Sequence, residues 1–380
     1  MINNTLFINE SPVYGGHEEM FIRILTYLDL EDDQEVTILT NSKNKKFNEE
    51  LERIKAQNKR KIKIISHSFM GLPVRPLTNL LAWHDALIIY RAIRSGCFNQ
   101  VVVVQGTIEI GGLSLFVAKL AGCKVITYIP ITKRSKSLGV KFGYLRDYIN
   151  KYFYYKLPDL FITISSFNKK ELVTDFNVNA EKIEIVYNFT EHSSEVSLTS
   201  QSIKLPSGIN FLLIGRIDFL QKRQDKFLYS FLRLKSGRNV NLHIVGDNDG
   251  TQSNTLRANF QNQENIFFHG WRDPFEIAVL IRESDGVILP SLFEGVPLVM
   301  IEAVKMHRVV FASNVDGMKE FLPAEWLFDA NDLSQAVKLM EQSKVCKFSN
   351  DKKLDALKTD FEDKFNAQQT CSAFLKIISR

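Results

Sequence analysis

Short apolar runs alternate with helical stretches along almost the whole chain, in two successive series. The first series fills residues 5–189, and the second begins at Phe211. Runs such as Val101–Gln105 and Gly286–Pro290 are almost wholly apolar, which is typical of strands buried on both faces of a parallel sheet. Strands that alternate with helices predict a doubly wound parallel sheet. The sequence therefore predicts an α/β protein with two Rossmann-like domains.

The predicted strands are short segments in both series. Those of the first series are Leu6–Asn9, Val36–Thr40, Ile62–Ser66, Val101–Gln105, Lys124–Ile129, Leu160–Ile164 and Ile183–Tyr187. Those of the second series are Phe211–Ile214, Leu242–Val245, Ile266–His269, Val287–Leu289, Val309–Ala312 and Leu327–Phe328.

The segment between the two series, residues 190–208, is polar and Ser-rich and ends in Pro206-Ser207-Gly208. This composition predicts an interdomain linker, so the domains are expected to comprise residues 1–189 and 209–350. Residues 351–380 have a long helical pattern. We expect this C-terminal helix to pack back on the first domain.

Length and composition limit the classes of protein to which the chain can belong. A chain of 380 residues is long enough for two domains that each bury a core. No stretch reaches the roughly 18 apolar residues of a membrane span, and the first residues lack the layout of a signal peptide. The four cysteines are far apart and have no metal-like spacing. These features favour a cytoplasmic location.

The charge is unevenly distributed. Residues 1–189 carry 25 Lys and Arg against 19 Asp and Glu, whereas the remainder carries 23 against 24. The first domain therefore has the positive net charge, which favours anionic substrates or surfaces.

The stretch Asp285–Met306 (DGVILPSLFEGVPLVMIEAVKM) carries the most informative chemistry. A strand, a Gly-containing turn and a helix with Pro297 in its first turn predict a helix N-terminus that binds an anion. Glu294 lies in the turn, where it either contacts a ligand or complements the helix dipole. Glu302 lies in an otherwise apolar helix and needs a partner, which is either a ligand hydroxyl or a structural Arg or Lys.

This stretch, LPSLFEGVPLVMIEA, resembles the signature of retaining nucleotide-sugar glycosyltransferases of family 4 (group 1). The resemblance implies the GT-B fold, with an acceptor-binding first domain and a donor-binding second domain that face a central cleft. It also implies that Glu294 approaches the donor sugar and that Glu302 binds the ribose. The other donor-binding residues expected here are Gly295, Val296, Pro297 and Leu298.

Cations follow the first strand of the second series in Gly215-Arg216-Ile217-Asp218-Phe219-Leu220-Gln221-Lys222. Arg216 and Lys222 are suited to one diphosphate, Arg as a fork and Lys as a point charge. Their placement resembles that of the family's cations that neutralise the leaving nucleotide diphosphate. Arg223 replaces the family's usual small residue, which leaves the path of this loop open.

A glycine pair, Gly15-Gly16, follows the first strand and opens the first helix. Glycines allow backbone N–H groups to approach a phosphate, and the pair resembles the family's loop that faces the donor diphosphate. A plain strand–helix turn is the alternative. The neighbouring His17 is a weak candidate for acceptor contact.

Two loops of the second domain have weaker signals. His269-Gly270-Trp271 follows a strand at the place where related enzymes hold the nucleotide base, so Gly270 and Trp271 are donor-binding candidates, although Trp271 is also a candidate for the core or rim. Asp247-Asn248-Asp249 has the form of a metal motif but consists of turn residues. The resemblance implies an enzyme without metal or cofactor, so we interpret it as a turn.

Residues 133–156 combine seven basic residues, one acidic residue and seven aromatic residues. Such a helix is typical of contact with an anionic membrane or polyanion. An ordinary amphipathic helix is equally compatible, since Phe142, Leu145, Ile149 and Phe153 have near-helical spacing.

The sequence departs from the family in two places. Many relatives have a His at the end of the strand that corresponds to Lys124–Ile129, whereas this chain has Tyr128-Ile129-Pro130. The small-residue turn expected after Glu302 is replaced by Met306-His307-Arg308.

The function predicted is retaining transfer of a sugar from a nucleotide diphosphate sugar to a saccharide or lipid-linked saccharide. By the resemblance, the pathway is cell-surface polysaccharide synthesis (O-antigen, capsule or exopolysaccharide), at the inner face of the plasma membrane. The expected catalytic residues are Glu294, Arg216 and Lys222. The alternatives are a nucleotide-sugar epimerase, a glycosyl phosphorylase, or a non-catalytic protein that binds membranes or nucleic acid through its basic first half.

Overall fold

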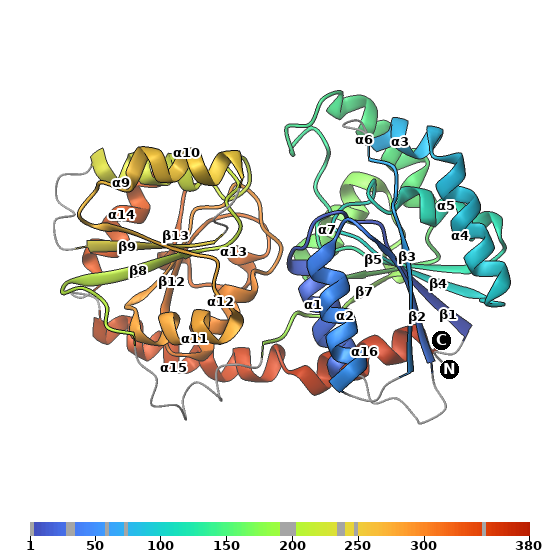
Figure 1. The fold of residues 1–380 in the computed structure, drawn as a ribbon. Coiled ribbons are helices and arrows are strands. Elements are labelled where there is room, and N and C mark those ends of the chain that lie inside the picture. The colour runs from blue at the N-terminus through green and yellow to red at the C-terminus, as the bar shows by residue number, and fades with distance from the viewer. Residues whose placement is uncertain are drawn as a thin grey trace. The chain divides into compact units, whose positions relative to one another are not determined.

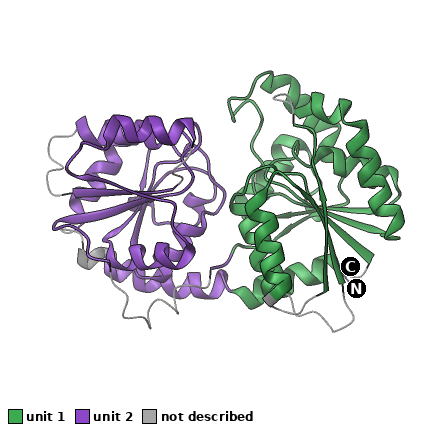
Figure 2. Cartoon of the chain, in the orientation of Figure 1, with its two compact units in different colours: residues 1–188, 367–380 green, residues 189–366 purple. Residues whose placement is uncertain are grey.

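The structure is a computed structural model that describes residues 4–27, 35–57, 61–71, 75–190, 203–233, 240–246, 250–343 and 347–380. The chain divides into two compact units (Figure 2). Unit 1 comprises Met1–Asn188 and Ala367–Arg380, and unit 2 comprises Phe189–Asn366. Of the predicted linker, residues 191–202 lie outside the described residues.

Unit 1 is built on a parallel sheet in the order β3-β2-β1-β4-β5-β6-β7. Its strands are β1 (Thr5–Asn9), β2 (Glu35–Asn41), β3 (Lys61–His67), β4 (Gln100–Val104), β5 (Lys124–Tyr128), β6 (Leu160–Thr163) and β7 (Ile183–Ile185). Its α-helices are α1 (Gly16–Tyr27), α2 (Lys45–Gln57), α3 (Arg75–Leu81), α4 (Trp83–Ser95), α5 (Gly112–Leu120), α6 (Gly143–Tyr152), α7 (Ser166–Phe176) and α16 (Ala367–Ile378), and its single-turn helices are η2 (Tyr154–Lys156) and η3 (Ala180–Lys182).

Unit 2 has a parallel sheet in the order β10-β9-β8-β11-β12-β13. Its strands are β8 (Ile209–Ile214), β9 (Val240–Val245), β10 (Ile266–Gly270), β11 (Gly286–Leu289), β12 (Val309–Ser313) and β13 (Leu327–Phe328). Its helices are α9 (Gln224–Arg233), α10 (Thr251–Phe260), α11 (Pro274–Glu283), α12 (Leu298–Lys305), α13 (Met318–Phe321), the single-turn η4 (Ala324–Trp326), α14 (Leu333–Gln342) and α15 (Lys347–Lys364).

The prediction of two parallel, doubly wound sheets is confirmed. Helices cover both faces of each sheet (Figure 1), and every predicted strand is present with its ends within two residues of the observed ones. Both faces of each sheet can pack against helices because successive side chains of a strand point to opposite sides. On β1, Phe7 packs on Phe21 of α1 with ring centroids 5.3 Å apart, whereas Leu6 and Ile8 join the core on the other face with Ile89 of α4.

The C-terminal tail corrects one prediction. Residues 351–380 do not form one helix that packs on the first domain, because α15 belongs to unit 2 and only α16 belongs to unit 1. Within unit 1, Gln100 donates to the carbonyl of Ile378 at 2.7 Å, and Thr370 donates to the carbonyl of Tyr187 at 3.1 Å. The tail therefore contributes one helix to each unit.

Residues 133–156 also differ from the prediction of a single helix. A turn precedes α6, and η2 follows it. Phe142, Leu145 and Phe153 are 68%, 60% and 42% exposed, and only Ile149 packs against the core. The interpretation of these residues as a core-facing stripe is therefore wrong for three of the four positions. Among the described helices, none is long and apolar enough to cross a bilayer.

Candidate active site

The loop after β8 in unit 2 presents the first predicted cation. Gly215 has φ +143°, a conformation that favours glycine, and it redirects the chain from the sheet. The Arg216 side chain is 47% exposed, with its guanidinium 3.1 Å from an Asp218 carboxylate oxygen. The other Asp218 oxygen accepts the backbone N–H groups of Leu220 and Gln221 at 3.0 and 2.8 Å. Asp218 thus shapes the turn that leads to Lys222.

Lys222 and Glu294 meet directly, although they are far apart in sequence. The Lys222 Nζ lies 3.0 Å from both carboxylate oxygens of Glu294, and Gln221 Nε2 donates to Glu294 Oε2 at 3.3 Å. The side chains of Lys222 and Glu294 are 19% and 12% exposed. Two of the three predicted catalytic residues therefore lie together, in an ion pair that the sequence did not predict, and Gln221 was missed.

The loop after β12 fixes the backbone of Glu294. The N–H of Glu294 donates to Asp316 Oδ2 at 2.9 Å. A Cβ on Gly317 would lie 2.2 Å from the carbonyl oxygen of Gly295, so only glycine permits this close approach. Sequence reasoning missed Asp316 and Gly317. The available signal was an Asp-Gly pair just after a buried strand, at the edge where the carboxyl ends of parallel strands meet.

Helix α12 begins at Leu298. Pro297 is its N-cap rather than a residue of its first turn, and no side chain caps the helix. Uncapped N–H groups at a helix N-terminus attract anions. These groups lie directly after Gly295 and Val296, as predicted. Glu302 is buried on α12, with 7% of its surface exposed.

Arg223, which departs from the family pattern, has a structural role in the loop. It adopts a left-handed conformation with φ +57°, and its guanidinium donates to the carbonyl of Ala330. Burial lowers the pKa of Arg223. The loop between Gly215 and Arg223 is therefore anchored at its far end.

The end of β10 presents Trp271. Its side chain is 51% exposed, so Trp271 is not a core residue. Gly270 has φ +72° and accepts the N–H of Gly246 at 3.0 Å. His269, just before it, lies 2.9 Å from His243, whose pKa burial lowers to about 4. Residues 247–249, read as a turn rather than a metal motif, lie outside the described residues.

In unit 1, Gly15 and Gly16 open α1 as predicted, but the neighbouring carboxylate changes their chemistry. The N–H of Gly15 donates to Glu18 Oε2 at 2.9 Å, so Glu18 takes the bond expected for a phosphate oxygen. His17 lies 2.7 Å from the other Glu18 oxygen, and its side chain is only 12% exposed. Burial raises the pKa of Glu18, but His17 and the hydrogen bonds outweigh burial and lower it.

Tyr128, which stands near the family's usual His, is a structural residue. It is 1% exposed, its ring packs edge-on against Phe374 of α16, and its hydroxyl lies 3.4 Å from Asn188 Oδ1. Burial raises the pKa of Tyr128. Its hydroxyl is thus held within the core of unit 1.

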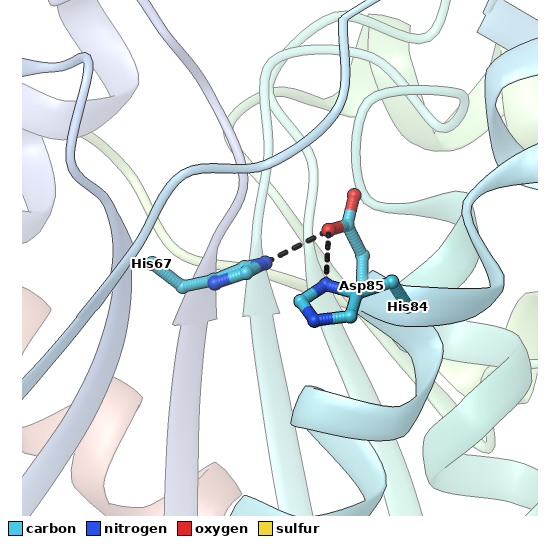
Figure 3. Close-up of side chains that lie close together, drawn as sticks. All are labelled: His67, His84 and Asp85. Carbon is cyan, nitrogen blue, oxygen red and sulfur yellow. Dashed lines mark hydrogen bonds and ion pairs between the residues drawn. The ribbon is translucent and has the colours of Figure 1, made fainter.

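One group in the described part of the chain has the spacing to hold a metal ion: His67, His84 and Asp85, at the end of β3 and the start of α4 (Figure 3). Asp85 Oδ1 lies 2.8 Å from His67 Nε2 and 3.9 Å from His84 Nδ1, while Oδ2 accepts the N–H of Met70 at 2.7 Å. Asp85 is therefore already used to hold the segment after β3. The absence of a metal from the reaction stays a prediction.

Comparison with known proteins shows which family model and which relatives the chain resembles. Residues 208–342 match the model "Glycosyl transferases group 1". An uncharacterized 41.2 kDa protein in the cps region of Klebsiella pneumoniae is 25% identical over 57% of this chain and 60% of its own length. An Escherichia coli protein, UDP-Gal:alpha-D-GlcNAc-diphosphoundecaprenol alpha-1,3-galactosyltransferase, is 33% identical over 25% of each chain. The chain thus matches less than two thirds of the length of these relatives.

Among solved structures, Anabaena Alr3699/HepE in complex with UDP-glucose superposes with a TM-score of 0.76, 14% identity and 99% coverage of both chains. This likeness concerns the fold. The family model spans β8 to α14 and so contains Arg216, Lys222, Glu294 and Glu302. The chain has the GT-B fold, and its second unit matches the model of the group 1 glycosyl transferases.

Proposed function

We propose that this protein is a retaining, metal-independent glycosyltransferase. It moves a sugar from a nucleotide diphosphate sugar to a saccharide or lipid-linked saccharide during cell-surface polysaccharide synthesis. The observation that carries the proposal is the junction of three loops of unit 2, in which Lys222 Nζ lies 3.0 Å from the Glu294 carboxylate and Asp316 holds the Glu294 backbone.

The loop edge of unit 2 suits a diphosphate. The Arg216 side chain is about half exposed although it pairs with Asp218, and the Lys222 side chain is partly exposed. The N-terminus of α12 has no side-chain cap. Fixed charges and N–H groups of this kind stabilise the charge that grows on a leaving group, which is usually the largest contribution to catalysis. We assign this role to Arg216, Lys222 and the N–H groups near Leu298.

Glu294 suits the donor sugar. Its carboxylate accepts from Lys222 and Gln221 and retains lone pairs for sugar hydroxyls. A bound diphosphate would attract Lys222 away from Glu294, which would leave more of the Glu294 lone pairs for sugar hydroxyls. Glu302, buried on α12, is proposed to bind the ribose, and Gly270 and Trp271 the base.

The chemistry needs no cofactor. The bond between the sugar C1 and the donor phosphate oxygen breaks, and a bond from C1 to the acceptor oxygen forms on the same face. The acceptor hydroxyl proton passes to the leaving phosphate. Gly15 and Gly16 are proposed to bind the diphosphate. The N–H of Gly15 already donates to Glu18, so the N–H of Gly16 is the proposed donor to a phosphate oxygen.

The relatives support the substrate classes. One is named for transfer from UDP-Gal to a diphosphoundecaprenol-linked sugar, and another is encoded in a cps region. We propose a comparable lipid-linked acceptor, reached at the cytoplasmic face of the membrane. No role for nucleic acid is proposed.

Residues 133–156 suit a membrane contact. Tyr144, Tyr148 and Tyr152 of α6 are 72%, 64% and 59% exposed, and aromatic residues of this kind favour the lipid–water interface. We expect co-sedimentation with anionic vesicles that weakens in Tyr144→Ser/Tyr148→Ser. Equal sedimentation of this variant and the unchanged protein would refute the contact.

The test of the function is thermal-shift binding against UDP-, GDP-, ADP- and TDP-sugars. A ligand that binds only the folded state raises the melting temperature. We expect one nucleotide series to stabilise the protein and Glu302→Ala to lose this effect, while Glu283→Ala, a matched substitution in α11, keeps it. Absence of a shift with every donor at millimolar concentration would overturn the proposal.

Assays with acceptor separate the rival enzymes. Conversion of a sugar nucleotide without any acceptor would identify an epimerase, and dependence on inorganic phosphate would identify a phosphorylase. Salt-sensitive binding to RNA or anionic lipid without donor binding would identify a binding protein.

A further inference from the structure

Three side chains with metal-binding atoms converge in unit 1, and the proposed function uses none of them. His67 is the last residue of β3, and His84 and Asp85 lie in the first turn of α4. One ligand atom of each residue lies within 4.8 Å of the other two. Figure 3 shows that both imidazole rings turn a nitrogen toward the same oxygen of Asp85. Two elements of the fold thus direct three ligands to one position.

The orientation of His84 is not a simple consequence of helix geometry. Adjacent residues of a helix do not face each other. The His84 side chain is 64% exposed, yet its Nδ1 lies 3.9 Å from Asp85 Oδ1. A single hydrogen bond between His67 and Asp85 is the ordinary alternative, but it does not require a second imidazole beside the carboxylate.

The buried part of this group is already positioned. Asp85 Oδ2 accepts the N–H of Met70 at 2.7 Å, which leaves Oδ1 to face the imidazoles. The His67 ring packs edge-on against Phe69 with ring centroids 4.9 Å apart, and Lys43 donates to the carbonyl of Phe69 at 2.9 Å. Hydrogen bonds and packing of this kind orient the ligands of metal sites. His67 and Asp85 therefore need little rearrangement to bind an ion.

The separations suit a small tetrahedral ion. Bonds of about 2.0–2.1 Å to nitrogen and oxygen place two ligands of such an ion about 3.3 Å apart. From Asp85 Oδ1, the distances are 2.8 Å to His67 Nε2 and 3.9 Å to His84 Nδ1, which lie on either side of this value. On binding, the ion replaces the proton between His67 and Asp85. The exposed His84 side chain then closes the site by a small rotation.

The ligand types select the class of ion. Mg²⁺ and Ca²⁺ prefer oxygen ligands, whereas imidazole nitrogen suits Zn²⁺ and other divalent transition metals. Two histidines and one carboxylate leave the fourth position of a Zn²⁺ ion to water. Solvent reaches the site on the side of His84, because the His67 and Asp85 side chains are only 16% and 7% exposed.

We propose that His67, His84 and Asp85 form a site for a divalent transition-metal ion of the zinc type. The ion joins the end of β3 to the first turn of α4 and so stabilises unit 1. It takes no part in the sugar transfer. The inference goes beyond the proposed function and does not depend on it.

The experiment is calorimetric titration of the full chain, without an affinity tag and after treatment with a chelator, with ZnCl₂, MgCl₂ and CaCl₂. We expect one Zn²⁺ per chain, bound at least about 100-fold more tightly than Mg²⁺ or Ca²⁺. Zn²⁺ should also raise the melting temperature, because it binds only the folded site. Equal affinity for Zn²⁺ and Mg²⁺, or no binding of Zn²⁺, would overturn the proposal.

Two variants remove a ligand and retain the fold. His84→Ala changes an exposed side chain, and Asp85→Asn retains an oxygen that can accept the N–H of Met70. Each should weaken Zn²⁺ binding by at least about ten-fold and abolish the thermal shift, with an unchanged melting temperature in the absence of metal. Unchanged Zn²⁺ binding in either variant would refute the site.

Two further variants are controls. Asp355→Asn changes a His–Asp pair that lies 3.0 Å from His307 Nε2 in unit 2, and Cys97→Ser removes an exposed thiol. Both should bind Zn²⁺ as tightly as the unchanged protein. A loss in Asp355→Asn equal to that in Asp85→Asn, or a loss in Cys97→Ser, would assign the ion to another position and overturn the proposal.

Discussion

In unit 2, a partly exposed ion pair joins the loops after β8 and β11, and the N–H of Glu294 donates to Asp316 in the loop after β12. In unit 1, by contrast, a buried ion pair joins the loop after β4 to α6. The side chains of Lys222 and Glu294 are 19% and 12% exposed, against 10% and 4% for Arg146 and Glu109. A partly exposed pair exchanges its partners for a ligand at modest cost, but separating a buried pair leaves an uncompensated charge. We infer that the first pair serves binding and the second serves architecture.

The largest effect is expected from the buried pair. Arg146→Met leaves the Glu109 carboxylate buried without its cation, which typically costs about 3–5 kcal/mol. Hydrogen exchange should show faster opening of β4 and β5 but unchanged protection of β8 and β11. Equal acceleration in both units, or no change in unit 1, would contradict the distinction.

Loss of charge in the loops of unit 2 should affect turnover rather than folding. Arg216→Ala should lower kcat by about 10²–10³-fold, the usual effect of removing a group that stabilises transition-state charge. Glu294→Ala, which removes the contact that orients the donor sugar, should lower kcat by about 10²-fold. Release of nucleotide diphosphate measures the rate, and the melting temperature reports the fold. Arg233→Ala, an exposed residue of α9, is the control. Near-normal turnover in either loop variant would refute the assigned roles.

A buried carboxyl in unit 1 should make stability depend on pH. Glu10, which follows β1, is 6% exposed, and burial raises its pKa from 4.5 to about 7, against the opposing hydrogen bonds from Ser114. The unfolded chain releases this proton near 4.5 and the folded chain only near 7. The contribution of Glu10 to stability is therefore full below pH 4.5 and is lost as the pH rises to about 7.

The amplitude expected for Glu10 is about 3 kcal/mol. The measurement is the difference in unfolding free energy between the unchanged protein and Glu10→Gln, from pH 4 to pH 8. The difference should decline with rising pH. A difference that is independent of pH would show that Glu10 ionises normally.

The smallest effect is expected from Gly317→Ala. Its Cβ would lie 2.2 Å from the carbonyl of Gly295, so the loop must shift, at a cost of about 1–3 kcal/mol. Because this loop holds the backbone of Glu294, we expect kcat to fall more than donor affinity. Gly250→Ala is a weaker control, since Gly250 has open space around it but a φ of +111°. Unchanged kcat in Gly317→Ala would show that the loop does not position Glu294.

The sequence by itself determined the two sheets and the local positions of four predicted site residues in unit 2. Buried parallel strands are continuously apolar, so their positions follow from local pattern. Arg216, Lys222, Glu294 and Glu302 each lie in or just after a strand–turn–helix segment, where the motif is local and spacing is informative.

Only the tertiary structure decided which side chains meet. The contact of Lys222 with Glu294, the position of Asp316, and the group of His67, His84 and Asp85 join residues from separate strands, loops and helices. The division of the tail into α15 and α16 likewise depends on which unit buries each helix. Periodicity indicates which residues are buried, but it contains no information about the element that buries them.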